Sequence, residues 1–426
     1  MLKFFKRTRN FFTTLFLNIL VWFMTHIWTS RTFVSITSMI SKYSPMTKPF
    51  TRFMDWVNRY IEDNLMFYNR ERRTALVVEA DNAIGYSLCK KLVKKNYHVI
   101  LGVKEVGRGL TMKSKLTKIR SYASVSIVAI DMSNPMNVLY AAKRIVQNYE
   151  SLDVLYLNSS TIRIDHMNWD VLREAFLKFR LAYLCTTGRV YEDGPNFVSV
   201  ASSGSTDLGF SQDFCQQVLS PFILAMELKG LLKEADLPGR IVWTGSSTCS
   251  AAGFSFDDPQ HIRDEESFYA HKYFVHLIQP ALNEYLLHTG VQSFEGSPGL
   301  IITGTSPRNL QRWTWLLYLI GFFIPTVQIY ASSGARTLLL LGTHRNQYKY
   351  LDPNHMYMMR RRLFGLQRCR YVKDVEIGES RRALTWLYDL YKRLQRYDIL
   401  TEGVTEDIKH FSDMNTVSPC RRSSVG

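Results

Sequence analysis

Short apolar runs alternate with longer amphipathic segments through the middle of this 426-residue chain. Runs such as TALVVE and HVILGV are continuous and rich in β-branched residues, which is typical of strands buried on both faces. Between the runs, apolar residues recur every three or four positions, as on one face of a helix. Strands are predicted at 74–79, 98–103, 124–131, 153–158, 240–244 and about 291–295, and helices at 83–96, 136–149, 211–235 and 267–288.

This alternation predicts an α/β fold built on a Rossmann-type doubly wound parallel sheet. Ligands of such sheets bind at the carboxyl ends of the strands, where the strand order reverses. The chain is divided accordingly into a basic and apolar membrane anchor (1–30), a linker (31–70), the Rossmann-type domain (71–310), membrane-associated or cavity-capping apolar helices (311–345), and a C-terminal helical extension with a polar tail (346–426).

Two apolar runs suggest membrane contact. Four Lys and Arg residues and no acid precede FFTTLFLNILVWFMTHIW at 11–28, a run about long enough to span a bilayer. We expect a membrane anchor here, with a mitochondrial address and a plain amphipathic helix as alternatives. The run at 313–330 is interrupted by Gly321 and Pro325, so we expect it to enter one leaflet or cap a lipid-binding cavity, with an internal core helix as the alternative.

Charge and cysteine content indicate which kinds of binding partner to expect. The net charge is +16, but basic clusters such as RRR at 360–362 lack the aromatic or motif support of a nucleic-acid site. A basic membrane-surface protein explains the charge better, and solvated surface charge is the alternative. The six Cys are scattered without CxxC or metal-type spacing, so we expect reduced thiols in a cytosolic environment and no metal site.

The segment VVEADNAIG lies where a nucleotide-binding loop would join the first strand to the first helix. Such a loop needs three small residues, and Glu79, Ala83 and Gly85 stand in their places. A carboxylate about 4 Å from the pyrophosphate would repel it by roughly 4 kcal/mol at an effective dielectric near 20, or about a thousandfold in affinity. Lys104 suits a 2′-phosphate and Asp131 suits the adenine amino group. These residues together predict no cofactor, or weak NADP(H) binding.

The order of VEADNAIG, DMSN, LDVLYLNSS, RIVWTGSS, FYAHKY and SPG resembles the short-chain dehydrogenase/reductase family, and more narrowly its 3-keto-steroid reductase branch. The resemblance runs from about residue 74 to residue 300. It implies that Asn158 and the Pro298–Gly299 turn lie at the cofactor. An N-terminal segment of about 70 residues is not typical of that branch.

The resemblance also implies a Ser that orients a carbonyl, a Tyr that protonates it, a Lys four residues later and an Asn that holds a relay water. The corresponding residues here are Ser246, Phe268, Lys272 and Gln217. Phenylalanine has no ionisable proton, so Phe268 cannot act as the acid. Tyr269 is the substitute that could reach the carbonyl, although the rotation this needs would move Lys272 off its target.

Two functions remain open. The nucleotide-binding loop, the relay residue and the acid all depart from the family pattern together. We therefore favour a catalytically impaired protein of sterol, steroid or lipid metabolism that binds a lipid or a protein partner. The alternative is an active NADPH-dependent 3-keto-steroid or lipid-carbonyl reductase with a remodelled site. The resemblance further implies homodimer pairing through the helices at 211–235 and 267–288. We expect the endoplasmic reticulum membrane, with the domain facing the cytosol, and a mitochondrial membrane as the alternative.

Overall fold

The computed structural model describes residues 72–120, 122–159, 164–167, 198–200, 204–246, 249, 254–260, 267–301, 327–328, 331–343, 351–362, 365–372 and 375–415. All of them belong to one compact unit, Arg72–Gly426. The predicted anchor and linker (1–70) lie outside the described residues, as does the apolar run 313–330 apart from residues 327–328.

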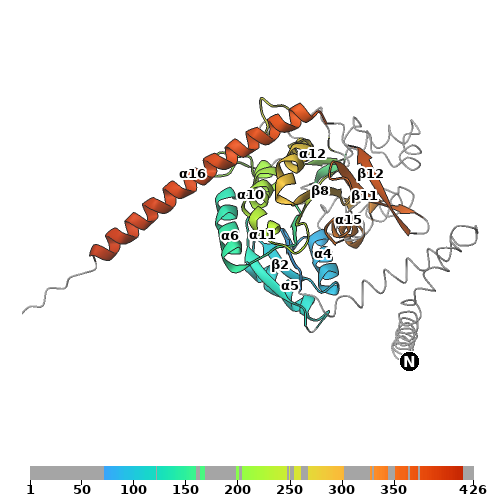
Figure 1. Cartoon of the computed structure of the whole chain (residues 1–426), viewed down its shortest axis with the longest axis horizontal. Helices are drawn as coiled ribbons and strands as arrows, with labels where there is room; N and C mark the ends of the chain where they lie inside the picture. Colours follow the sequence, from blue (N-terminus) through green and yellow to red (C-terminus); the bar gives the residue numbers. More distant parts are fainter. Residues whose placement is uncertain are drawn as a thin grey trace, which may run out of the picture. The chain divides into compact units, whose positions relative to one another are not determined.

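An eight-stranded sheet forms the centre of this unit (Figure 1), with the order β12-β11-β8-β7-β4-β1-β2-β3. The seven strands from β11 to β3 pair in parallel, and only β12 runs antiparallel to its neighbour. The strand order reverses between β1 and β4, which confirms a Rossmann-type doubly wound sheet. The strands are β1 (Thr74–Val77), β2 (His98–Val103), β3 (Val125–Ala129), β4 (Val154–Leu157), β7 (Arg240–Thr244), β8 (Gln292–Ser297), β11 (His355–Arg362) and β12 (Gly365–Val372).

Two short pairs of strands stand apart from the main sheet. One pair is antiparallel and the other is parallel. They are β5 (Ile164–Met167) with β6 (Val198–Val200), and β9 (Leu300–Ile301) with β10 (Val327–Gln328).

Helices cover both faces of the sheet (Figure 1), which is why its central strands β1, β2 and β4 are largely apolar. Ala75 and Val77 of β1 pack into a cluster with α4, α5 and α15, whereas Leu76 and the following Val78 pack into a cluster with α6, α10, α12 and α16. The helices are α4 (Ala83–Lys94), α5 (Val106–Thr117), α6 (Pro135–Asn148), α9 (Gln212–Phe214), the π-helical turn η2 (Cys215–Leu219), α10 (Ser220–Glu227), α11 (Lys229–Lys233), α12 (Ser267–Leu286), the 3₁₀ turn η4 (Leu287–Thr289), α15 (Ala331–Thr343) and α16 (Ile377–Asn415).

The structure corrects the predicted organisation in three places. The sheet continues past residue 310, because β11 pairs with β8 at Met356, Tyr357 and Met358. Helix α15, within the range expected to be membrane-associated or cavity-capping, packs Leu338 and Leu341 into the core. The single helix expected at 211–235 is divided into α9, η2, α10 and α11.

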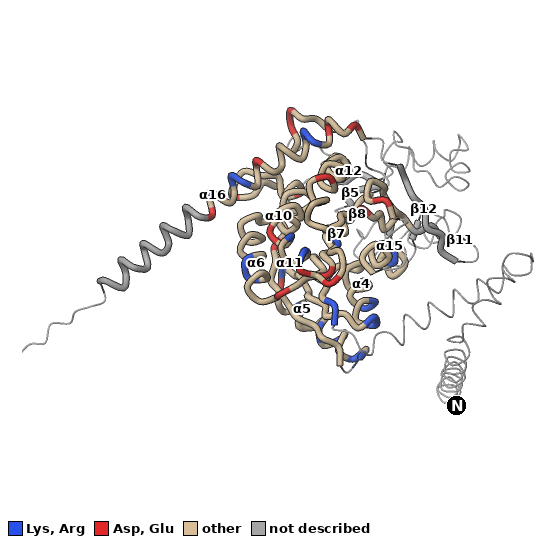
Figure 2. Tube along the Cα trace, viewed as in Figure 1, with Lys and Arg blue, Asp and Glu red and all other residues tan. Residues whose placement is uncertain are grey.

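The described residues show no concentrated basic surface and no membrane-spanning helix. Lys and Arg residues are spread over α4, α5, α6 and α16 and do not form one stripe (Figure 2). Among the helices that the structure describes, none has the combination of length and apolar character needed to cross a bilayer.

Candidate functional site

The turn after β1 lies where the strand order reverses. Glu79 adopts a left-handed backbone with φ of 48°, a conformation that favours glycine and is uncommon for other residues. Its carbonyl oxygen accepts hydrogen bonds from the Asn158 side-chain amide and from the Asn82 backbone N–H, each at 3.3 Å. Asn158, at the end of β4, is fully buried. Asn158 therefore helps to hold a backbone conformation that glycine would adopt without strain.

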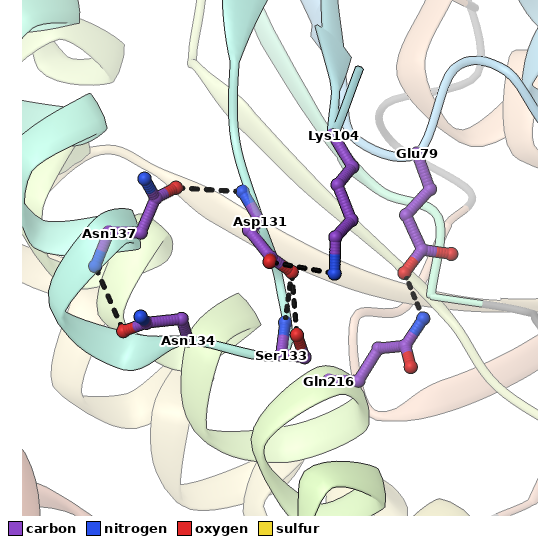
Figure 3. Close-up of polar contacts among 7 residues, drawn as sticks. All are labelled: Glu79, Lys104, Asp131, Ser133, Asn134, Asn137 and Gln216. Carbon is purple, nitrogen blue, oxygen red and sulfur yellow. Dashed lines mark hydrogen bonds and ion pairs between the residues drawn. The ribbon is translucent and has the colours of Figure 1, made fainter. Parts of the chain in front are cut away.

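The half-buried Glu79 side chain points toward Gln216 (Figure 3). Its Oε1 accepts a hydrogen bond of 2.5 Å from Nε2 of Gln216, which lies on η2. A hydrogen bond to an ionised carboxylate is shorter and stronger than one between neutral groups. The contact joins the turn after β1 to the π-helical turn η2, at the place where the nucleotide was expected.

The first turn of α4 is also engaged within the chain. Asn82 is the N-cap of the helix, and its Oδ1 accepts from the Gly85 N–H at 2.7 Å and from the Asn158 amide at 3.0 Å. Gly85 packs tightly, since a β-carbon there would lie 2.6 Å from the Glu79 carbonyl oxygen. A phosphate-binding helix offers such N–H groups to its ligand, but here a side chain has taken the Gly85 donor.

The two residues expected at the adenosine end bind each other. Lys104 Nζ lies 2.8 Å from Asp131 Oδ2. The other oxygen of Asp131 accepts from the Ser133 N–H and hydroxyl, at 3.0 and 2.6 Å (Figure 3). Partial burial acts to raise the pKa of Asp131, but the hydrogen bonds from Lys104 and Ser133 outweigh it and lower that pKa. Asp131 is therefore an ionised partner of Lys104.

Lys272 is the most deeply placed of the predicted catalytic residues. Its side chain extends from α12 and is only 2% exposed. Nζ donates to the backbone oxygens of Ser159 at 2.6 Å and Thr244 at 2.9 Å, beyond the end of β4 and at the end of β7. The ammonium also lies 5.6 Å from the ring centroid of Phe268, within cation–π range.

Burial lowers the pKa of Lys272 to about 8, because the ammonium loses its hydration. The charges of Glu79, Glu295 and Cys249 oppose this change. Glu295 is fully buried on β8, and its Oε2 lies 2.8 Å from His276 Nδ1 on α12. Neither Glu295 nor His276 was predicted from the sequence, and the signal that could have revealed them is that Glu295 is the one charged residue of β8 (QSFEGS), a strand of the central sheet.

The position of the family acid is occupied by a buried phenyl ring. Phe268 is 4% exposed and meets the half-buried Tyr269 edge to face, with ring centroids 5.4 Å apart. Ser246 is also half-buried and lies two residues after Thr244, the last residue of β7. Ser246 and Lys272 are thus both tied to the carboxyl end of β7, but no hydroxyl occupies position 268.

The remaining predicted residues lie around this end of the sheet. Gln217 is buried on η2, and its Oε1 has no hydrogen-bond partner within the described part of the chain. Pro298 and Gly299 follow β8, where Gly299 has φ of 76° and donates its N–H to the Ser297 hydroxyl. Ala83 is the first residue of α4 and is exposed.

In this arrangement the crevice does not fit a dinucleotide pyrophosphate. The Glu79 carboxylate projects into it, and the Gly85 N–H is bonded to Asn82. An entering anion would meet a like charge and would have to displace a hydrogen-bonded cap. The polar groups of the crevice are therefore already hydrogen-bonded to one another, and a buried lysine lies beside them.

The strand order and the turn after β1 define a Rossmann-type protein. The family model for short chain dehydrogenase matches residues 73–178. The 3-keto-steroid reductase/17-beta-hydroxysteroid dehydrogenase 7 of Rattus norvegicus is 26% identical over 335 residues, which covers 76% of this chain and 97% of that protein. Its counterpart from Homo sapiens is 26% identical over 301 residues, covering 69% and 86%. The chain therefore resembles the short-chain dehydrogenases over residues 73–178, and it is similar to the 3-keto-steroid reductases over most of its length.

Solved structures give a weaker likeness. L-sorbose reductase from Gluconobacter frateurii, complexed with NADPH and L-sorbose, aligns with a TM-score of 0.47 and 15% identity, covering 65% of this chain and 92% of that one.

Proposed function

We propose that this chain is a short-chain dehydrogenase/reductase-type protein of sterol or steroid metabolism that has lost hydride transfer and acts by binding a lipid or a protein partner. The observation that carries the proposal is the Glu79–Gln216 hydrogen bond across the nucleotide crevice. It supports a crevice closed by the chain's own side chains. The similarity to 3-keto-steroid reductases supports the sterol or steroid class.

The residues around Lys272 are a second, independent support for the proposed loss of hydride transfer. A reductase of this kind must deliver a proton to the carbonyl oxygen as the hydride arrives. Phe268 has no proton to give, and the Lys272 ammonium donates to two backbone carbonyls. Two of the three N–H donors of this ammonium are therefore used by backbone carbonyls of the chain itself.

The experiment is a titration of the purified full chain with NADPH, followed by fluorescence of the nucleotide. The wild type is expected to show no saturable binding, whereas Glu79→Gly is expected to gain affinity by up to about a thousandfold, because it removes the opposing charge and suits the left-handed backbone. Gln216→Ala is the matched control, since it breaks the same hydrogen bond but keeps the carboxylate. Tight NADPH binding by the wild type would overturn the closed-crevice premise.

The ligand half of the proposal needs its own measurement. We expect a radiolabelled 3-keto-steroid or sterol to bind the purified chain in the absence of NADPH and to be recovered unreduced when NADPH is present. Recovery of the 3-hydroxy product at a rate that Lys272→Ala abolishes would refute it.

A second candidate is an active NADPH-dependent 3-keto-steroid or lipid-carbonyl reductase. The observation in its favour is that Tyr269 is half-buried one residue after Phe268, on the helix that also carries Lys272. In that case Tyr269 would supply the proton and Ser246 would orient the carbonyl. Loss of turnover in Tyr269→Phe, with steroid binding unchanged, would identify this candidate as correct.

We also propose that residues 1–30 attach the chain to the endoplasmic reticulum membrane, with the described domain on the cytosolic side. The basis is the basic start followed by the apolar run 11–28. Carbonate extraction of membranes is the test: the full chain should stay in the pellet, and a variant in which Leu15, Leu17 and Leu20 are replaced by Ser should be released. Retention of that variant would contradict the assignment.

A further inference from the structure

The C-terminal helix α16 packs along the helical layer beside the candidate site (Figure 1). It packs against α12 and α6, and single residues of it reach α9 and α10. Ala383, Leu387, Tyr391 and Leu394 are buried at intervals of three and four residues, which gives α16 one continuous apolar stripe. This half of the helix is therefore part of the domain core.

Polar contacts fix α16 on both sides of its central turns. The Ser380 hydroxyl accepts from the Ala281 N–H at 3.0 Å, directly after the proline inside α12. Further along, Glu227 of α10 accepts from the Tyr391 hydroxyl at 2.8 Å. Lys143 of α6 lies 2.8 Å from Asp398. The turns between these contacts are held in a defined register against α10 and α12.

Trp386 lies on those central turns and contacts two aromatic residues of the site's supporting helices. Its ring meets Phe214 edge-on with centroids 5.9 Å apart, and it lies at the same distance from Phe274 of α12. Both phenylalanines are fully buried and stack on each other at 6.2 Å. Phe214 also lies 5.7 Å from the ring of His271. Trp386 thus closes an aromatic cluster that joins three helical elements.

Phe214 directly precedes η2, and Gln216 is the second residue of that turn. A π-helical turn is an uncommon backbone state that occurs as single turns, often at functional sites, so it depends on its surroundings. His271, on the other side of the same cluster, is the neighbour of Lys272 in α12. The aromatic cluster therefore contacts both the segment that carries Gln216 and the helix that carries Lys272.

We propose that Trp386 is a positioning residue: it fixes the π-helical turn so that Gln216 reaches Glu79. By this route the C-terminal helix sets the geometry of the nucleotide crevice. Because Trp386 acts on the position of Gln216, its role does not depend on whether the chain binds NADPH.

Two buried thiols allow the proposal to be tested on the full chain. Cys215 opens the π-helical turn, and burial raises the pKa of its thiol to about 12. Cys89 is buried in α4 on the opposite face of the sheet, and burial raises its pKa as well. A protonated, buried thiol reacts only when its segment opens, so Cys215 reports on η2 and Cys89 reports on the rest of the domain.

The experiment compares alkylation of the two thiols, resolved by peptide mass spectrometry, in the wild type, Trp386→Ala, Trp386→Phe and Leu394→Ala. Trp386→Ala is expected to label Cys215 at least about tenfold faster while Cys89 is unchanged. Trp386→Phe should restore protection. Leu394→Ala removes another buried side chain of α16, two turns away, and should leave Cys215 protected.

Three results would overturn the proposal. These are an unchanged Cys215 rate in Trp386→Ala, a parallel increase at Cys89, or an equal effect of Leu394→Ala. The last two would mean that Trp386 contributes only general stability. If Trp386→Ala does not fold, Trp386→Leu keeps most of the apolar volume and removes the ring contacts, and the same expectations apply to it.

Discussion

The buried ammonium of Lys272 gives the free energy of unfolding a distinctive dependence on pH. The ordinary lysine pKa of 10.5 applies to the unfolded chain, whereas burial lowers it to about 8 in the folded protein. Between pH 8 and 10.5 the unfolded chain holds this proton and the folded protein does not. Unfolding then takes up a proton, so stability rises with pH in this window, and below pH 8 both states are charged and the gain is absent.

The magnitude follows from the gap between the two pKa values. Each pH unit of the window adds about 1.4 kcal/mol, so the full gain is about 3 kcal/mol. The measurement needs only the lower part of this window, because the free energy of unfolding should rise by about 2 kcal/mol between about pH 7.5 and 9.5. The same figure measures how strongly the fold disfavours the ammonium near neutral pH.

Urea denaturation at several pH values, followed by tryptophan fluorescence, measures this effect. Other groups also titrate in the range, so the quantity to follow is the difference between wild type and Lys272→Met, in which only the lysine's own titration remains. The difference should shift in favour of the wild type by about 2 kcal/mol over the range. A difference that stays constant with pH would show that the Lys272 ammonium is hydrated in the folded protein, which would refute its burial between β4 and β7.

Three substitutions test the supports of the site, each by the midpoint of urea denaturation. Gly85→Ala is expected to cost about 1–3 kcal/mol, because the new β-carbon would lie 2.6 Å from a backbone oxygen of the preceding turn; no loss would mean that the turn can shift freely. Gly245→Ala should cost a similar amount, since its β-carbon would lie 2.7 Å from Cγ of the buried Glu295, and Gly245→Ala combined with Glu295→Ala should be less than additive. Ser380→Ala removes the acceptor of the Ala281 N–H beside a proline and should cost about 1–2 kcal/mol, with Ser380→Thr as the conservative control.

The middle strands β1, β2 and β4 could be predicted because they are buried on both faces, and such strands are continuous apolar runs. The helix α5 escaped prediction because it contains Gly107 and Gly109 and buries only one narrow stripe. The strand β11 escaped because its last three residues are arginines, and its pairing with β8 spans a long separation along the chain. Long-range pairing of this kind leaves no local periodicity to detect.

The candidate site divides in the same way. A carboxylate at position 79 and a phenyl ring at position 268 could be read from the sequence, because each replaces a required chemical group. The partner of Glu79 could not be predicted, since it depends on the π-helical turn: the expected relay residue is Gln217, and the residue that reaches Glu79 is its neighbour Gln216. One extra residue in a helical turn changes which side chain faces the crevice.

The proposed loss of nucleotide binding rests on several contacts of the crevice together and not on one substitution. Asn158 supports the strained turn at Glu79, and Glu79 in turn binds Gln216, so the carboxylate is held by both its backbone and its side chain. At the adenosine end, Lys104 and Asp131 neutralise each other. A ligand phosphate would have to break these contacts before forming its own, and a buried polar group left without its partner costs about 1–3 kcal/mol. Restoring a hydroxyl at position 268 alone would leave all of them intact, so the proposal predicts that Phe268→Tyr does not confer hydride transfer unless the crevice is changed as well.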